Sequence, residues 1–277
     1  MNKDSAFIRG QSHIVCQDYA MSGMIQNLSW AIVADGCSMI RTSNESVNHP
    51  YSDFSARIVA FSAKEAIYEL QQHGDATGLL RSDFITLLRS KVRTIGDLVG
   101  ITEIAGDATL NIACHHDSII MHMMIGDGVV VVDTERELII RERKFVPNFP
   151  YYVSYILLPN RAKHYNSLGV KASEHTYIID KKTGGIRESE EEKSPDLTES
   201  VEIYNTKETK SITVFSDGIG DLRKGQQLSV IQAVQKMLPF KSYGGTFVKR
   251  RMRGFERTLA KECIVANDDI AMATIVT

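Results

Sequence analysis

The order of elements along the chain predicts an α+β fold. Strand-like runs come first, followed by two helical stretches, a long series of short strands, two more helical stretches and a final strand. Helices and strands are thus segregated along the chain, which favours antiparallel sheets covered by helices on their outer faces. The 277 residues are 43% apolar and 24% charged, which is the composition of an ordinary globular protein with one or two domains.

The first well-defined element is the apolar run at 28–34, which is rich in strand formers and ends at Asp35. This pattern predicts a buried strand that delivers a carboxylate to a turn. Two amphipathic helices of about five turns follow, because apolar residues recur at helical spacing over 54–70 and 84–98. The glycines at the ends of 74–78 predict the loop between these helices.

The hydrophobic pattern after the second helix changes period and predicts a meander of antiparallel strands. Its strands are expected at 109–114, 118–125, 128–133 and 137–141, with continuations at 151–158 and 175–179. The polar stretch 181–200 carries two adjacent glycines and an acidic run, and it predicts an exposed loop. The rest of the chain is expected to form strands at 201–204 and 211–215, helices at 227–238 and 246–263, and a last strand at 270–276.

Charge and hydropathy exclude several kinds of partner. Lys plus Arg number 32 against 34 Asp plus Glu, so we expect no general attraction for nucleic acid or for an anionic membrane. The longest apolar runs are strand-sized and the first residues form no apolar signal core, so neither a membrane span nor export is expected. Four scattered cysteines without a CxxC pair argue against a cysteine-based zinc site and favour reduced thiols in a cytoplasmic protein.

Aspartates at the ends of strand-like runs carry the chemical signal. They are Asp18, Asp35, Asp127, Asp217 and the pair Asp268-Asp269. A buried acid is costly unless it is paired or binds a cation, and several converging acids repel one another unless a hard divalent ion neutralises them. A single Asp-Gly is an ordinary turn, but the ordered series predicts an all-oxygen site for magnesium, manganese or calcium.

The ordered series resembles the metal-dependent phosphatases of the protein phosphatase 2C family, and it is most similar to their compact bacterial branch. The resemblance runs from about residue 5 to residue 277. No single motif is specific, whereas the order and spacing of the series are. The matching segments are Ser12-His13…Cys16-Gln17-Asp18, Val33-Ala34-Asp35-Gly36, Ala108-Thr109-Leu110, Gly126-Asp127-Gly128, Ser216-Asp217-Gly218-Ile219 and Asp268-Asp269-Ile270-Ala271.

The resemblance implies a more specific fold than the pattern alone. It implies a four-layer αββα sandwich, in which two antiparallel sheets are flanked by antiparallel helix pairs and the metals lie at one end of the sheets. The whole chain, 1–277, would then form a single domain with a variable flap around 143–200. In the family, this flap is thought to help select substrates.

The resemblance also implies a role for each acid. Asp35 would bridge two Mn²⁺ or Mg²⁺ ions, the Gly36 carbonyl would bind one of them, and Asp217 and Asp268 would complete the other. Asp127 would form a third, weaker site together with Asp217. In this scheme Asp35, Asp217 and Asp268 act in catalysis through a water that bridges the ions and attacks phosphorus, expelling the serine or threonine alkoxide.

Several positions near the N-terminus depart from the common family pattern. Asp18 is retained and would hold a water on an ion, directly or through a further contact. His13 stands where many members place an Arg that grips the substrate phosphate, so this grip is expected to be weaker and more dependent on pH. Gln17 replaces a frequent Glu, and Cys37-Ser38 replaces a segment that often carries a His.

The function implied by the resemblance is hydrolysis of phosphoserine and phosphothreonine in proteins. The expected partners are a phosphorylated protein substrate and a cognate Ser/Thr kinase in bacterial signalling. Two alternatives stay open. The departures at His13, Gln17 and Cys37 are compatible with a catalytically weak binding or sensor module, a pseudophosphatase, on the same fold. The acids are also compatible with a small-molecule phosphomonoesterase.

Overall fold

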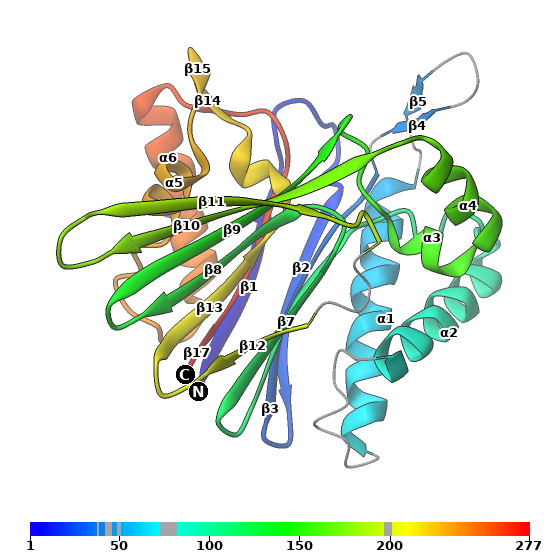
Figure 1. The fold of residues 1–277 in the computed structure, drawn as a ribbon, viewed down its shortest axis with the longest axis horizontal. Helices are drawn as coiled ribbons and strands as arrows, with labels where there is room; N and C mark the ends of the chain where they lie inside the picture. The colour runs from blue at the N-terminus through cyan, green and yellow to red at the C-terminus, as the bar shows by residue number, and fades with distance from the viewer. Residues whose placement is uncertain (38, 42–45, 49–50, 73–81, 197–200) are drawn as a thin grey trace.

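Two antiparallel sheets lie face to face at the centre of the structure, with helices on both outer sides (Figure 1). This computed structural model describes residues 1–37, 39–41, 46–48, 51–72, 82–196 and 201–277. The first strand pairs with the last one, with Asn2 opposite Val276, so the two chain ends lie side by side. The layers confirm the predicted α+β fold and its αββα order.

The larger sheet has seven strands and the smaller one five. In spatial order the larger sheet contains β1 (Asn2–Ile8), β17 (Ile270–Val276), β13 (Thr209–Phe215), β8 (Gly128–Thr134), β9 (Glu137–Val146), β10 (Lys171–Asp180) and β11 (Ile186–Lys193). The smaller sheet contains β12 (Glu202–Asn205), β7 (Ile119–Ile125), β6 (Leu110–His116), β3 (Leu28–Asp35) and β2 (Asp18–Ile25). Short ribbons are formed by β4 (Met39–Arg41) with β5 (Ser46–Asn48), and by β15 (Gln226–Gln227), β14 (Leu222–Lys224) and β16 (Val265–Ala266).

Strand β3 shows why the sheets form the core. All of its residues from Leu28 to Ala34 are buried, because both faces of the strand are covered. Trp30 and Ile32 belong to the apolar cluster shared with the helices, whereas Ala31 and Val33 belong to the cluster between the two sheets. Successive side chains of a strand point to opposite faces, so a strand covered on both sides is a continuous apolar run rather than an alternating one.

Helix pairs cover the outer faces of the sheets. Helices α1 (Ser52–Gln72) and α2 (Ser82–Val99) are the two helices predicted at 54–70 and 84–98, and they pack on the five-stranded sheet. Helices α5 (Val230–Met237) and α6 (Phe247–Glu262) pack on the seven-stranded sheet. Among the described residues, none of the helices combines the length and the apolar character that a membrane span requires.

The prediction of a strand at 151–158 is wrong. The segment forms the short helix α3 (Val153–Leu157), and Pro159 then starts α4 (Pro159–Ser167), which was not predicted. A short apolar run is compatible with a buried strand or a buried helix, and here tertiary packing decides. The centroid of the Tyr155 ring lies 4.7 Å from that of the Tyr165 ring, within a cluster of aromatic side chains that the helical path brings together.

Two further expectations need correction. The predicted loop at 181–200 contains β11, which pairs with β10 along its length, although its residues are almost all exposed as expected. An edge strand that is exposed on both faces lacks the alternation that would reveal it. The predicted meander is divided between the sheets, since β6 pairs with β7 in one sheet and β8 with β9 in the other. The loop expected at 74–78, residue 38 and residues 197–200 lie outside the described residues.

The core packing of β3 gives a stability prediction. Ile32 is fully buried between β3 and the helices, so Ile32→Ala is expected to lower the free energy of unfolding by about 2–5 kcal/mol. Ile203 on β12 is 60% exposed, so Ile203→Ala should change it by no more than about 0.5 kcal/mol. Urea denaturation followed by circular dichroism measures both values, and equal losses would contradict this assignment of the core.

Candidate metal centre

Three acids from separate strand ends meet at one edge of the two sheets. Asp35 ends β3, Asp127 lies in the turn between β7 and β8, and Asp217 begins the 3-10 turn η1 (Asp217–Gly220) after β13. One carboxylate oxygen from each of the three lies within 4.8 Å of those of the other two. The structure therefore brings together acids that are up to 182 residues apart in the sequence, since 217 minus 35 is 182.

A cavity of about 230 Å³ opens on this cluster. Its lining residues are Asp35, Gly36, Cys37, Asp127, Asn148, Phe149, Pro150, Tyr152, Asp217 and Asp268. The lining therefore combines four acids with two aromatic side chains, Phe149 and Tyr152. None of these described lining residues is a Lys, Arg or His, so the acids are not neutralised by a basic side chain in the cavity wall.

Asp18 lies directly behind the cluster rather than in the cavity wall. It pairs with Asp35 across β2 and β3 and is 2% exposed. Its carboxyl group interacts with Asp35 and Ser216 through side-chain hydrogen bonds. Asp18 is therefore placed to act on the cavity through Asp35.

The buried acids resist ionisation. Burial, followed by repulsion from neighbouring carboxylates, raises the pKa of Asp35 and of Asp217 well above the usual range. Burial is also the main cause that raises the pKa of Asp18 and of Asp127 to about 7. The pKa of Asp268 is raised by burial as well. The cluster carries an electrostatic cost that only protons or cations can remove.

The donor set fits a hard divalent cation. In the described part of the chain, Asp127 Oδ1 and Asp18 Oδ2 are buried without a hydrogen-bond partner, which is costly for a carboxylate oxygen. The acids offer only oxygen ligands, which suit magnesium, manganese or calcium better than zinc. A cation would satisfy the orphaned Asp127 oxygen and remove the repulsion between the acids at the same time.

Gly36 brings backbone to the same place. A Cβ atom on this residue would lie 2.1 Å from the Ser52 carbonyl oxygen, so only glycine allows the turn after β3 to pack against the start of α1. Gly218 plays the same part on the other sheet, where a Cβ would lie 1.8 Å from the Asp269 carbonyl oxygen. Close backbone approach at these two glycines holds the acid-bearing turns together.

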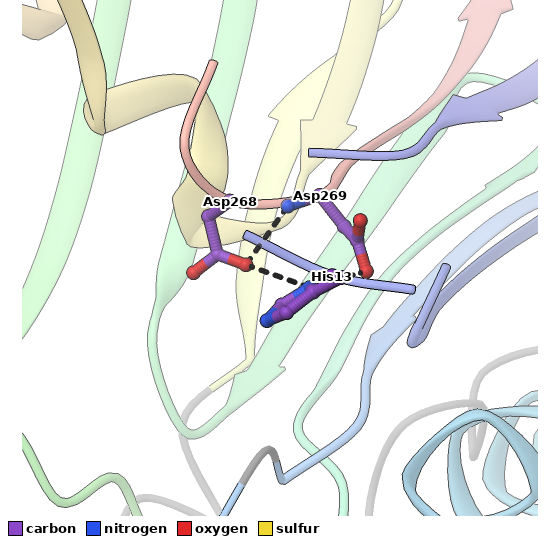
Figure 2. Close-up of side chains that lie close together, drawn as sticks. All are labelled: His13, Asp268 and Asp269. Carbon is purple, nitrogen blue, oxygen red and sulfur yellow. Dashed lines mark hydrogen bonds and ion pairs between the residues drawn. The ribbon is translucent and has the colours of Figure 1, made fainter. Parts of the chain in front are cut away.

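A second cluster ties the N-terminal segment to the last strand (Figure 2). The buried carboxylate of Asp269 accepts hydrogen bonds from the backbone N–H of Gly10 at 2.7 Å, from the backbone N–H of Gln17 and from His13 Nδ1 at 2.9 Å. His13 Nδ1 also lies 3.6 Å from Asp268 Oδ1, which in turn accepts the backbone N–H of Asp269. Asp269 therefore anchors the chain segment that leads to Asp18.

The structure places His13 outside the cavity that the acids line. Its Nδ1 is engaged by Asp269, and His13 is absent from the residues that line the cavity. Asp269, which sequence reasoning left without a role, is the anchor instead. The sequence feature that could have indicated this role is the pair of adjacent aspartates before the last strand. Adjacent residues of an extended chain point to opposite sides, so two such acids contact different partners. The two aromatic lining residues were also missed, since Tyr152 was predicted to lie in a strand at 151–158 and Phe149 was assigned to no element.

Comparisons with known proteins agree with this architecture. A serine/threonine phosphatase from Mycobacterium tuberculosis is 12% identical with a TM-score of 0.53, and the match covers 99% of this chain and 98% of that one. The phosphatase Stp1 from Staphylococcus aureus is 12% identical with a TM-score of 0.54, covering 100% and 95%. A bacterial serine phosphatase is 12% identical with a TM-score of 0.54, and the match covers 100% of this chain and 97% of that one. At these identities the likeness shows the fold alone.

The family is shown by the sequence itself. None of the curated proteins matches the chain. A family model described as protein phosphatase 2C matches residues 9–254, a span that contains Asp35, Asp127 and Asp217. This span is most of the chain, and the resemblance found in the ordered aspartates is thereby confirmed. The chain belongs to the protein phosphatase 2C family.

Proposed function

We propose that this protein is a Mn²⁺- or Mg²⁺-dependent phosphatase that hydrolyses phosphoserine and phosphothreonine in proteins. The observation that carries the proposal is a cavity lined by four acids from both sheets and, among the described residues, by no basic side chain. A phosphate group cannot enter such a cavity unless cations balance its charge. Metal dependence and phosphate binding are therefore coupled in this site.

The chain supplies the ligands for the cations. Asp35, Asp217 and Asp268, with the carbonyl of Gly36, would hold two ions, and Asp127 with Asp217 would hold a third. Bound ions of this kind polarise a phosphoryl oxygen and lower the pKa of water so that it attacks at neutral pH. The sequence contains neither a Cys-x5-Arg loop nor an Asp-x-Asp-x-Thr motif, which agrees with hydrolysis without a phosphorylated enzyme.

The two aromatic lining residues have a different task. Phe149 and Tyr152 line the same cavity as the acids, and their rings would exclude bulk water from part of the surroundings of the reacting ester. Burial raises the pKa of Tyr152 well above its usual range, so this phenol keeps its proton throughout the physiological range. Partial exclusion of water strengthens the electrostatic contacts of the acids.

One observation favours the alternative of a catalytically weak binding module. The residue that stands at the position of the family's phosphate-gripping Arg, His13, is engaged by Asp269 and is absent from the cavity lining. A phosphoprotein would then be held by the cations and by surfaces outside the cavity. Binding of Mn²⁺ and of a phosphopeptide without turnover would identify such a module, and turnover only of small phosphomonoesters would identify the second alternative.

Removing one charge from the centre tests the proposed reaction. We expect Asp35→Asn and Asp217→Asn each to lower Mn²⁺-dependent hydrolysis of a phosphothreonine peptide by about 10²-fold or more, the scale of one lost transition-state electrostatic contact. Asp133, near the other end of β8, pairs with Lys181 and is the matched control. Asp133→Asn should keep full activity. Full activity of either centre variant, or of wild type in excess chelator, would refute the proposal.

The repulsion between the acids gives a pH prediction. The pKa of Asp127 is about 7 in the folded chain and about 3.9 in an unfolded one, so the folded state holds the extra proton between these values. Protonated Asp127 therefore contributes to the free energy of unfolding of the metal-free protein. This contribution is fully present below about pH 4 and is lost as the pH rises through 7. In chelator at pH 7.5, Asp127→Asn should melt higher than wild type, by about 2–4 °C per kcal/mol of relieved repulsion.

Saturating Mn²⁺ should reverse this order, because the cation then stabilises wild type through the carboxylate that the variant lacks. Differential scanning calorimetry gives the melting temperature of each protein under the four conditions, which are pH 5 and pH 7.5, each with chelator or with Mn²⁺. A variant that melts below wild type in chelator at pH 7.5 would show that the repulsion is absent.

A further inference from the structure

A buried amide bridges the two sheets directly behind the acids. Asn111 lies on β6 of the five-stranded sheet and is 1% exposed. Its Nδ2 donates one hydrogen bond to the Val129 carbonyl and one to the Phe215 carbonyl of the seven-stranded sheet, each at 3.0 Å. Val129 and Phe215 are partners in the last described rung between β8 and β13. The amide therefore sits where these two strands separate toward their acids.

Asn111 contacts or pairs with residues that are each two positions from one of the three acids along the chain. Val129 comes two residues after Asp127, and Phe215 comes two residues before Asp217. On its own sheet, Asn111 pairs with Val33 of β3, two residues before Asp35. A single side chain thus contacts or pairs with the chain two residues away from each member of the cluster.

The orientation of the amide is held by a histidine. Because Asn111 Nδ2 donates to two carbonyls, its Oδ1 must accept, and it lies 2.9 Å from His122 Nε2 on β7. An amide oxygen can only accept, so His122 Nε2 is the donor of this hydrogen bond. Burial, with Arg143 and Arg141 nearby, lowers the pKa of His122 to about 3. On its other side, His122 Nδ1 lies 3.3 Å from Glu202 Oε2 on β12.

Space for the amide is provided by Gly128. A Cβ at this position would lie 2.8 Å from the Phe215 carbonyl oxygen and 3.3 Å from Asn111 Nδ2. Gly128 also has a φ of 140°, which side chains other than hydrogen rarely permit. The glycine that follows Asp127 is therefore required by the bridge as well as by the turn.

We propose that Asn111 is a positioning residue that sets the separation of Asp35, Asp127 and Asp217, and through it the affinity of the centre for divalent cations. Three mutually repelling carboxylates come from two sheets, and the hydrogen bonds of Asn111 link those sheets two residues away from Asp127 and from Asp217. The inference rests on the proposed function only in taking these acids as cation ligands.

Titration of the whole protein with Mn²⁺ alone tests this role. Asn111→Leu keeps a similar volume but removes both N–H donors, and we expect it to raise the calorimetric Kd for Mn²⁺ by about 10- to 100-fold. The loss of para-nitrophenyl phosphate turnover should be greater at limiting Mn²⁺ than at saturating Mn²⁺.

Thr213 provides a matched control on β13. Its Oγ1 lies 3.0 Å from Thr274 Oγ1 in a buried contact between strands. Thr213→Val should lower the melting temperature and leave the Kd for Mn²⁺ unchanged, because this contact is not made to Asn111 or to the acids. If Thr213→Val weakens Mn²⁺ binding as much as Asn111→Leu, loss of sheet packing explains the effect and the proposal is overturned.

A second pair of variants decides the question if Asn111→Leu does not fold. The amide nitrogen of Gln can replace His122 Nε2 as the donor to Asn111, whereas Phe cannot. His122→Gln should therefore keep the Mn²⁺ affinity of wild type and His122→Phe should weaken it. Equal affinities for these two variants would overturn the proposal.

The outcomes separate this inference from the proposed function. Wild type that binds Mn²⁺ and hydrolyses phosphoesters, together with Asn111→Leu of unchanged affinity, would overturn the inference alone. Wild type that binds no Mn²⁺ at millimolar concentration would remove the proposed function and the inference with it.

Discussion

Repulsion between buried carboxylates is the constraint on which the rest of the structure depends. Asp35, Asp127 and Asp217 end three strands from two sheets, and their carboxylate oxygens converge within 4.8 Å. The described cavity wall contains no basic residue to balance them, so protons or cations must do so. A hard cation bound between these acids would remove an electrostatic cost that folding has already imposed, and this is the physical reason to expect such a cation here.

Contacts outside the cluster must hold the acids in place against this repulsion. The close approaches at Gly36 and Gly218 lock two acid-bearing turns to their neighbours. The carboxylate of Asp269 fixes the N-terminal segment through two backbone N–H groups and a histidine, and Asn111 connects the sheets from behind. Apart from Gly36, none of these residues lines the cavity, yet each contacts or adjoins a stretch of chain that carries an acid. The geometry of the centre is therefore a property of how the two sheets are joined.

The extent to which sequence predicts structure differs between segments. The strand at β3 and helices α1 and α2 were predicted closely, because long apolar runs and helical periodicity record burial directly. The segment from 151 to 158 was wrongly predicted as a strand, since packing among Tyr151, Tyr155 and Tyr165 decides its path. Strand β11 was missed because exposure on both faces leaves no alternating pattern. As a result the aromatic half of the cavity could not be predicted, whereas the acidic half could.

The sequence by itself determined the family, the fold class and the identity of the acids, because these depend on residue types in a fixed order along the chain. Only the tertiary structure decided which acids share a cavity, since Asp268 lines it while the adjacent Asp269 turns away to anchor the N-terminal segment. It also decided that Asn111, an ordinary strand residue in the sequence, lies behind all three acids of the cluster. Distances between strands of different sheets arise from packing across the whole core, and no local pattern of residues encodes them.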